Sequence, residues 1–458
     1  MKTKLYSMLN QLRRLAGRAP VRLGPPCAPS VPPPSLGGQR TARPALFAFA
    51  ARRGLMRPAI LALCLATALA ARAQTPMPPV VSNVSAVQRA GTSGSGSLVD
   101  INYLISDANF TSDNVFILVS TNSGTSWTVP ATTFTGSYGT NLPVNATPSG
   151  RIATWNAGKD WDGQYDTHCR VRVLANNLGL VLIPPGTYLR GNAMSADTDI
   201  TDAPQYPVYV SAFYMDSTLV TGGKWNFVVQ SYASSHGYTF DDPGSFKALS
   251  HPVQTINWYD AVKWCNARSE MEGLTPCYYT NTTLSSGYIY KYGDVDITNL
   301  NVNWNANGYR LPTEAEWEKA ARGGATGHRF PWTYTDSINE TNANYSVAGG
   351  PPYDSGGTQT FATGAMPYTS PVGSFPANGY GLFDMAGNVQ EWCWDWYATG
   401  YYQPNQTDPQ GPSSVGYRVQ RGGNWTDDAS NARCAFRNGY TPATAYSDLG
   451  FRCVRGVP

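Results

Sequence analysis

Histidine is scarce in this chain of 458 residues, which contains only His168, His236, His251 and His328. The four are scattered, and no two are spaced i,i+4 to share one face of a helix. A zinc site or a three-histidine iron site is therefore not expected. The sequence also lacks a glycine-rich phosphate loop and a dinucleotide-binding fingerprint, which argues against nucleotide-dependent chemistry.

Charged residues are also few, at 14%, whereas the chain has 12% aromatic residues, 45 glycines and 34 prolines. This composition is typical of loop-rich globular domains, and the length allows two or three of them. Residues 1–73 hold 12 of the 33 basic residues and no acidic residue. The remaining 21 basic and 30 acidic residues give a net charge of −9. Such a charge argues against nucleic acid or an anionic membrane as a partner.

Long apolar runs are absent after residue 73, so no transmembrane segment is expected in the mature chain. Before that point, Met56 and Arg57 precede an apolar run from Ala59 to Ala71, followed by Arg72-Ala73. A basic start, a short apolar run and a small-x-small end predict a signal peptide at 56–73 and a periplasmic or secreted protein. Residues 1–55 are rich in arginine and proline and show no apolar periodicity. They are interpreted as an unusual leader or as upstream sequence translated by mistake.

Six cysteines remain after the predicted signal peptide: Cys169, Cys265, Cys277, Cys393, Cys434 and Cys453. An even number in an oxidising compartment permits disulfides. The connectivity cannot be read from the sequence, but the short loop between them makes Cys265–Cys277 the best local candidate. No two of these cysteines have the CxxC spacing that is typical of zinc and redox motifs.

Residues 79–176 are predicted to form an all-β domain. Val99 to Ile105 partly alternates apolar and polar residues, Val115 to Val119 is a short apolar run, and residues 122–124 have turn chemistry. Further strands are expected at 127–129, 151–155 and 170–174. Short strands at this spacing predict an immunoglobulin- or fibronectin-like sandwich. The segment has no cluster of histidine, cysteine or carboxylate residues, so a spacer or docking role is expected.

Residues 180–458 have an α+β pattern with long loops rich in glycine, asparagine and serine. Asn257 is expected to cap a helix from Trp258 to Glu270. Thr313 and Glu316 form a capping box for a second helix, which should end at the glycine pair 323–324. A third helix is predicted at about 221–234. Long loops in a compact domain are usually functional or held by ions or disulfides.

Five motifs in this second region occur in a defined order. They are LIPPGTYLRG (182–191), GYRLPTEAEWEKAARGG (308–324), NGYGLFDMAGNVQEW (378–392), RGGNW (421–425) and GFRC (450–453). Together they resemble the formylglycine-generating enzyme, or sulfatase-modifying factor, family. The resemblance covers about residues 180–458 and implies a loop-rich relative of the C-type lectin fold.

The resemblance breaks where the family's enzymes bind copper. Those enzymes oxidise a sulfatase cysteine to formylglycine, and two cysteines shortly after the Arg-Gly-Gly motif bind copper(I). A soft metal needs soft sulfur ligands. Here Asp427 stands at the position of the first thiolate, the second position is lost in a shorter loop, and Cys434 matches a structural cysteine of the family. Copper and formylglycine generation are therefore not expected, and no catalytic residue is assigned.

The resemblance also implies structural calcium. Carboxylate, amide and carbonyl oxygens in glycine-containing turns suit this hard cation. The alternative is that the same acidic side chains only hold their turns by hydrogen bonds. One site would use the side chains of Asp384 and Glu391 with the carbonyls of Gly387 and Val389, and the other Asn344 and the Tyr345 carbonyl, with Asp354 as a substitute acid.

Trp425, Asp427 and Asp428 are the candidate ligand-binding residues. Adjacent carboxylates beside an indole, at the position of the family's reactive centre, could bind a cation or a polar ligand. The alternative is a solvated turn in which Asp428 caps the next segment.

Two functions remain open. The first is a non-catalytic scaffold that binds an unidentified extracytoplasmic protein, peptide or glycan. The second is an enzyme with different chemistry on the same framework, as in the branch of the superfamily that acts in siderophore chromophore maturation, or a divergent sulfatase-modifying factor. Asp427 is the only polar residue that the sequence offers for such chemistry.

Overall fold

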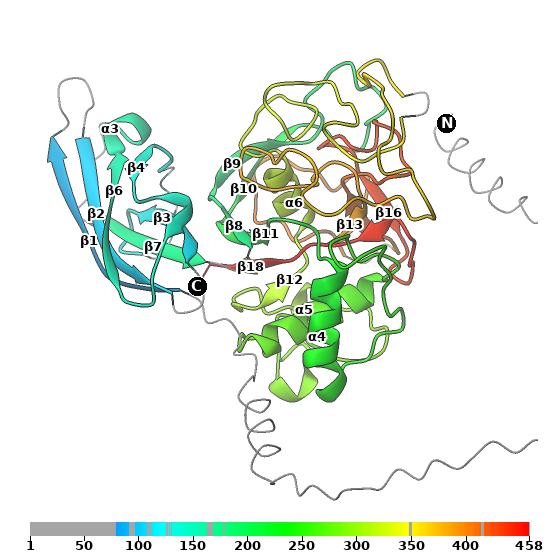
Figure 1. Ribbon diagram of the computed structural model, residues 1–458, viewed down its shortest axis with the longest axis horizontal. Coiled ribbons are helices and arrows are strands. Elements are labelled where there is room, and N and C mark those ends of the chain that lie inside the picture. The colour runs from blue at the N-terminus through cyan, green and yellow to red at the C-terminus, as the bar shows by residue number, and fades with distance from the viewer. Residues whose placement is uncertain are drawn as a thin grey trace, which may run out of the picture. The chain divides into compact units, whose positions relative to one another are not determined.

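The computed structural model describes residues 79–457, except 91–96, 108–110, 125–126, 128, 130, 163–167, 177–178, 348–349 and 414–415. The predicted leader (1–55) and signal peptide (56–73) lie outside the described residues. The described part of the chain is mixed α and β, with many strands and few helices (Figure 1). Within it, we find no helix with the length and apolar character that a membrane crossing requires.

Two antiparallel sheets form the N-terminal region, in the strand orders β1-β2-β6-β4 and β5-β3-β7. Their facing side chains share one core, which includes Ile101, Ile117 and Trp155. Of the predicted strand at 127–129, the described residues show an isolated bridge from Val129 to Val119, and residue 128 lies outside them. The elements are β1 (Val80–Ala90), β2 (Ser97–Ser106), β3 (Ser112–Ser120), β4 (Phe134–Gly136), β5 (Gly139–Pro143), β6 (Ser149–Asn156), α3 (Ala157–Asp160) and β7 (Arg170–Asn176).

The C-terminal region contains three small sheets and three helices of eight or more residues among its described residues. The strand orders are β14-β10-β9, β12-β18-β11-β8 and β16-β15-β13-β17. The strands are β8 (Leu180–Ile183), β9 (Gly186–Arg190), β10 (Tyr206–Val210), β11 (Phe213–Asp216), β12 (Tyr309–Arg310), β13 (Gln390–Trp396), β14 (Gln406–Thr407), β15 (Arg418–Arg421), β16 (Asn438–Tyr440), β17 (Leu449–Gly450) and β18 (Val454–Gly456). The helices are α4 (Gly222–Ser231), η1 (Ala233–Ser235), α5 (Trp258–Met271), η2 (Ser286–Tyr288), η3 (Asn299–Asn301) and α6 (Glu314–Ala321).

The three predicted helices are confirmed as α4, α5 and α6. For α5 and α6 the structure shows the capping contacts that the sequence predicted. The Asn257 side chain accepts a hydrogen bond from the third residue of α5. At α6, the Thr313 hydroxyl accepts from the Glu316 amide at 3.2 Å, and the Glu316 carboxylate accepts from the Thr313 amide at 2.8 Å. Gly323 and Gly324 follow α6 with φ values of 57° and 82°, a conformation that favours glycine.

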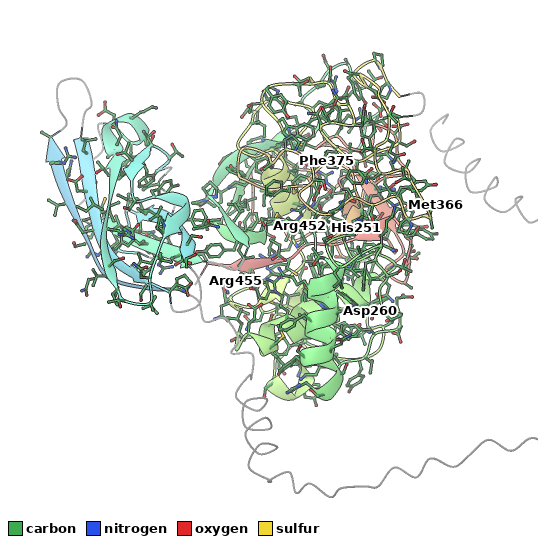
Figure 2. The ribbon with its side chains drawn as sticks, viewed as in Figure 1. His251, Asp260, Met366, Phe375, Arg452 and Arg455 are labelled. Atoms are coloured by element: carbon green, nitrogen blue, oxygen red, sulfur yellow. The ribbon has the colours of Figure 1, made fainter. Side chains whose placement is uncertain are left out.

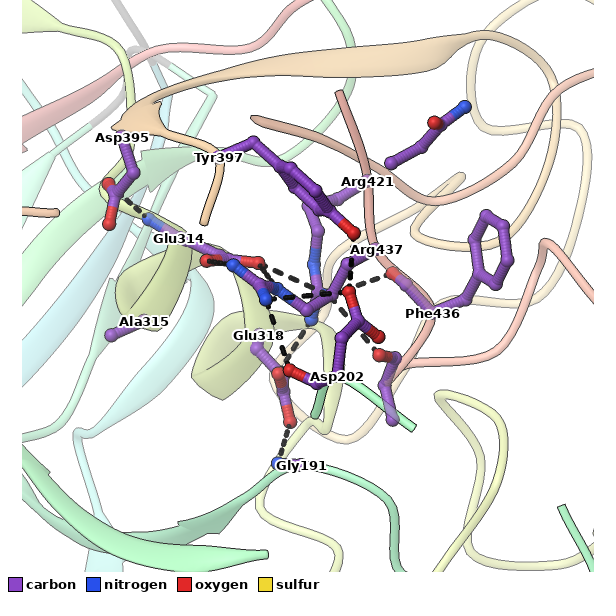
Figure 3. Close-up of polar contacts among 12 residues, drawn as sticks. Gly191, Asp202, Glu314, Ala315, Glu318, Asp395, Tyr397, Arg421, Phe436 and Arg437 are labelled. Carbon is purple, nitrogen blue, oxygen red and sulfur yellow. Dashed lines mark hydrogen bonds and ion pairs between the residues drawn. The ribbon is translucent and has the colours of Figure 1, made fainter. Parts of the chain in front are cut away.

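A buried ion network fixes the segment that follows the RGGNW motif (Figure 3). Arg421 donates to Glu318 of α6 at 2.6 Å and to the carbonyls of Cys434 and Phe436 at 2.7 Å. Arg437 pairs with Glu314 at the start of the same helix. Because removing one partner would leave a buried charge unpaired, the network holds residues 434–437 in one position.

Candidate functional site

A tight turn after the RGGNW motif orients Asp427. Its Oδ2 accepts hydrogen bonds from Gln390 Nε2 at 3.1 Å and Asn424 Nδ2 at 2.8 Å. The Asn424 side-chain oxygen in turn accepts from the amides of Thr426 and Asp427. Gln390 and Asn424 are only 2% and 3% exposed. Two buried carboxamides therefore hold the Asp427 carboxylate, which is itself half-buried.

Trp425 and Asp428 have different environments from Asp427. Trp425 is 5% exposed, its indole donates to the Ser447 carbonyl at 3.2 Å, and its ring meets Tyr368 edge-on at 5.3 Å. Asp428 is exposed and accepts from the amide and hydroxyl of Ser430, as a turn-capping residue does. Asp427 is therefore the one of the three predicted ligand-binding residues that is partly exposed and oriented by buried side chains.

Sequence reasoning missed the residues that folding brings beside this turn. The Thr426 hydroxyl donates to Asp448 at 3.5 Å, and the rings of Tyr440 and Tyr446 meet edge-on at 5.5 Å. Burial, together with the negative charges of Asp427 and Asp448, raises the pKa of Tyr440 to about 12. Tyr440 is therefore a neutral hydrogen-bonding group at physiological pH. No motif marks these residues, because they approach only through the pairing of β15 with β16 and of β13 with β17.

The two acidic residues of the Asp384 region differ in their hydrogen bonding: Asp384 has a carboxylate oxygen without a partner, whereas both oxygens of Glu391 are hydrogen-bonded. Asp384 is 6% exposed, and its Oδ2 accepts from the Gly373 amide at 2.7 Å. Its Oδ1 is buried without a hydrogen-bond partner. Burial raises the Asp384 pKa to about 6. Both oxygens of Glu391, by contrast, accept from the guanidinium of Arg452, which is labelled in Figure 2, at 2.7 and 2.9 Å.

The Asn344 region directly adjoins the Asp384 turn. The Asn344 carbonyl accepts from the Asn388 amide at 2.7 Å. Asn344 Oδ1 and Asp354 Oδ2 are both buried without a hydrogen-bond partner, and Tyr345 donates to the other Asp354 oxygen at 2.6 Å. Glu340 Oε2, which the sequence did not single out, is also buried without a partner.

The buried oxygens without partners in these two regions are carboxylate and amide oxygens, the type of ligand that hard cations prefer. The described residues contain no group of three or more histidine, cysteine, aspartate and glutamate side chains arranged around a metal position. A cation here would therefore depend on amide and carbonyl oxygens as well as carboxylates, which is usual for Ca²⁺. Buried oxygens without partners occur at three predicted ligand residues, Asn344, Asp354 and Asp384.

The structure gives Cys265 a second possible disulfide partner. All six cysteines beyond residue 73 are free thiols in the structure. The Cys265 sulfur lies 3.5 Å from the sulfur of Cys453, 188 residues away in the chain. The sequence singled out Cys265–Cys277, and that pairing stays a prediction beside the Cys265–Cys453 contact, which sequence separation could not have indicated.

Comparison with known proteins identifies the family. The family described as "Sulfatase-modifying factor enzyme 1-like domain" matches residues 170–457, which is more than half of the chain. The chain belongs to this family.

Individual relatives carry different names. Chaperone protein LppX of Paenibacillus barcinonensis is 30% identical over 276 residues, which are 60% of this chain and 89% of that protein. Formylglycine-generating enzyme of Mus musculus is 32% identical over 301 residues, covering 60% of this chain and 74% of that enzyme. Among solved structures, Treponema denticola variable protein 1 matches with 30% identity and a TM-score of 0.47, covering 62% of this chain and 95% of that one.

Residues 425–434, where the resemblance implies the family's copper site, do not offer the donors that copper(I) needs. Residues 425–434 contain a single cysteine, Cys434. Its thiol is 1% exposed, and burial raises its pKa to about 12, so the thiolate is not available at neutral pH. Asp427 supplies hard oxygen in place of the first thiolate. The donor set therefore lacks the sulfur pair that a soft metal requires.

Proposed function

We propose that this chain is an exported, non-catalytic binding protein built on a sulfatase-modifying factor framework. One observation carries the proposal. Asp427, which the resemblance implies stands in place of a copper thiolate, is held by Gln390 and Asn424, while Cys434 is buried with a raised pKa. The framework around this position is retained, and the groups that perform the family's oxidation are replaced.

The proposed ligand is an extracytoplasmic protein, peptide or glycan. The half-buried Asp427 carboxylate, the Asp448 carboxylate and the rings of Tyr440 and Tyr446 combine hydrogen-bonding groups with apolar surface, as binding sites commonly do. A relative covered over 89% of its length is named a chaperone protein, which favours a polypeptide ligand.

The architecture and location belong to the same proposal. The two antiparallel sheets of residues 80–176, which share one core, support an immunoglobulin- or fibronectin-like sandwich. Family membership and the three small sheets with few helices support a C-type-lectin-like second domain. The apolar run that ends in Ala71-Arg72-Ala73 supports export to the periplasm or beyond.

Calcium is proposed as the structural cofactor of the Asn344 and Asp384 regions. The support is the set of buried oxygens without partners on Asn344, Asp354 and Asp384. Calcium added to chelator-treated protein should raise the melting temperature, because a ligand that binds only the folded state stabilises it. Asp384→Asn should reduce that increase, whereas Asp428→Asn, in an exposed turn, should leave it unchanged. An increase of the same size in Asp384→Asn would contradict a site at this residue.

Oxygen uptake distinguishes binding from catalysis. The purified chain is mixed with a panel of cysteine-containing peptides and small phenols, with the mouse formylglycine-generating enzyme as positive control. We expect no uptake above the protein-free rate. Sustained uptake that is lost in Asp427→Asn would overturn the proposal and favour an enzyme with different chemistry on this framework.

A further inference from the structure

A polar pocket of about 420 Å³ lies in the C-terminal region, and we propose that it binds a neutral saccharide. Its walls include the turn between β10 and β11, the segment 304–307 before β12, the start of α6, residues 408–410 and the end of β18. None of Trp425, Asp427 and Asp428 lines it. The proposed saccharide site is therefore separate from the ligand site of the proposed function, and variants of its own lining residues test it.

The Arg310 guanidinium in the pocket wall is neutralised by Glu316, and the Asp408 carboxylate leaves a net negative charge. Arg310 and Glu316 form a two-pronged ion pair with both nitrogen–oxygen distances at 2.6 Å. Asp408 accepts from the amide and the hydroxyl of Ser211 at 2.6 and 2.8 Å. Because the guanidinium already has a carboxylate partner, a phosphate or carboxylate ligand would have to break that pair. The arrangement disfavours an anionic ligand.

The remaining polar walls suit a ligand with many hydroxyl groups. Asn305 and Gln410 each carry a carboxamide, which offers both a donor and an acceptor. Asn307 adds the donor group of a third carboxamide, whose oxygen accepts from the Thr275 amide at 2.9 Å. Neighbouring sugar hydroxyls present the same alternation of donors and acceptors. A ligand with a single charged or acceptor group would use few of these partners.

Trp304 adds a fixed aromatic wall. Its indole nitrogen donates to the Asn299 carbonyl at 3.2 Å, and the Arg310 guanidinium lies 5.2 Å from the ring centre. The side chain is only half-buried. A rigid aromatic surface beside hydrogen-bonding groups can pack on the carbon–hydrogen face of a sugar ring. The volume lies at the lower end of the range for ligand pockets, which indicates a mono- or disaccharide.

The test is a titration of the full chain with glucose, galactose, N-acetylglucosamine and their β-1,4-linked disaccharides. Ligand-observed NMR detects binding, and calorimetry measures affinity. We expect at least one of these sugars to bind saturably, with a Kd of about 1 mM or tighter. Inorganic phosphate should not bind or compete. If no sugar of the panel binds, or if phosphate displaces the bound sugar, the proposal is wrong.

Two sets of variants locate the binding. Asn305→Ala combined with Gln410→Ala removes two wall carboxamides and should weaken sugar binding by about tenfold or more. Trp304→Ala should do the same, but its loss of packing makes the double variant the primary test. Tyr334→Ala, at a side chain that is 65% exposed and does not line the pocket, is the control and should bind as wild type does. Unchanged affinity in the double variant would overturn the assignment.

Discussion

Gly387 shows how a single residue constrains the turn between the two regions where calcium is proposed. Its φ is 82°, and a Cβ there would lie 2.4 Å from the Asn344 carbonyl oxygen. Gly381 has a similar φ of 84° but nothing within 4 Å of an added Cβ. A substitution by alanine would therefore strain the backbone at both positions, but it would cause a steric clash only at Gly387.

We expect Gly381→Ala to lower the free energy of unfolding by about 1 kcal/mol, from the left-handed conformation alone. Gly387→Ala should lower it by about 3 kcal/mol or more, because the Asn344 backbone must also move. Urea unfolding of the two variants measures the difference. Equal losses would show that close contact between Gly387 and Asn344 does not hold this turn.

The importance of single residues at the candidate site was only partly predictable. Asp427 could be singled out because a motif places it where the family has a cysteine. Its partner Gln390 lies 37 residues earlier, and Asp448 lies 22 residues after Thr426. Such neighbours follow from strand pairing in the folded chain, for which the sequence carries no short-range signal.

Individual elements were predictable where local chemistry determines them. The caps at Asn257 and Thr313 identify the starts of α5 and α6, and the strands near 99–105, 115–119, 151–155 and 170–174 lie within β2, β3, β6 and β7. β1 was missed, because nearly all its residues are exposed and its apolar residues do not alternate with polar ones. β13 was missed although Trp392, Trp394 and Trp396 alternate with Cys393 and Asp395. All seven of its residues are buried, so the polar residues between the tryptophans do not mark an exposed face as they do in a half-buried strand.

The contact between Cys265 of α5 and Cys453, next to β18, predicts a disulfide between these elements under oxidising conditions. Two-electron oxidation by oxygen or a disulfide reagent would remove one hydrogen from each thiol and join the sulfurs. Peptide mapping of protein exported to an oxidising compartment should show Cys265–Cys453. Because the bond closes a long loop, its loss in Cys453→Ser should lower the free energy of unfolding by about 4 kcal/mol. Cys277→Ser is the control that keeps the bond, and a Cys265–Cys277 linkage would contradict the structure.

At the scale of the whole molecule, stability should respond to pH through Asp395, which accepts a hydrogen bond at 2.8 Å from the backbone amide of Glu314 in the buried ion network (Figure 3). Burial, and then the charge of Glu314, raise the Asp395 pKa to about 7. In the unfolded chain an aspartate has a pKa of about 3.9. Between these values the folded state keeps a proton that the unfolded state releases. The stability that Asp395 contributes is therefore complete below about pH 4, falls as the pH rises toward 7, and changes little above that.

Asp395→Asn removes this titration. Wild type should lose about 2 kcal/mol of unfolding free energy between pH 5 and pH 8 through this titration, and the variant should not. Urea unfolding at the two pH values measures the change. Identical pH dependence in wild type and Asp395→Asn would show that Asp395 is ionised in the folded protein throughout this range.

Family membership alone would lead one to expect copper chemistry in this protein, whereas the side chains of residues 425–434 argue against it. The sequence motifs and the family match identify the framework. The side chains of residues 425–434 do not offer the thiolate pair that the resemblance to copper enzymes implies, since Asp427 carries oxygen instead of sulfur and Cys434 is buried. The account therefore depends on the claim that these residues form no copper thiolate centre.

Anaerobic loading with copper(I), followed by measurement of the copper retained against a competing chelator, tests that claim most directly. Other thiols, including the Cys265 and Cys453 pair, could bind copper, so wild type is compared with Cys434→Ser. The account predicts the same copper content in both proteins. The loss of one tightly bound copper in Cys434→Ser, with folding unchanged, would contradict it.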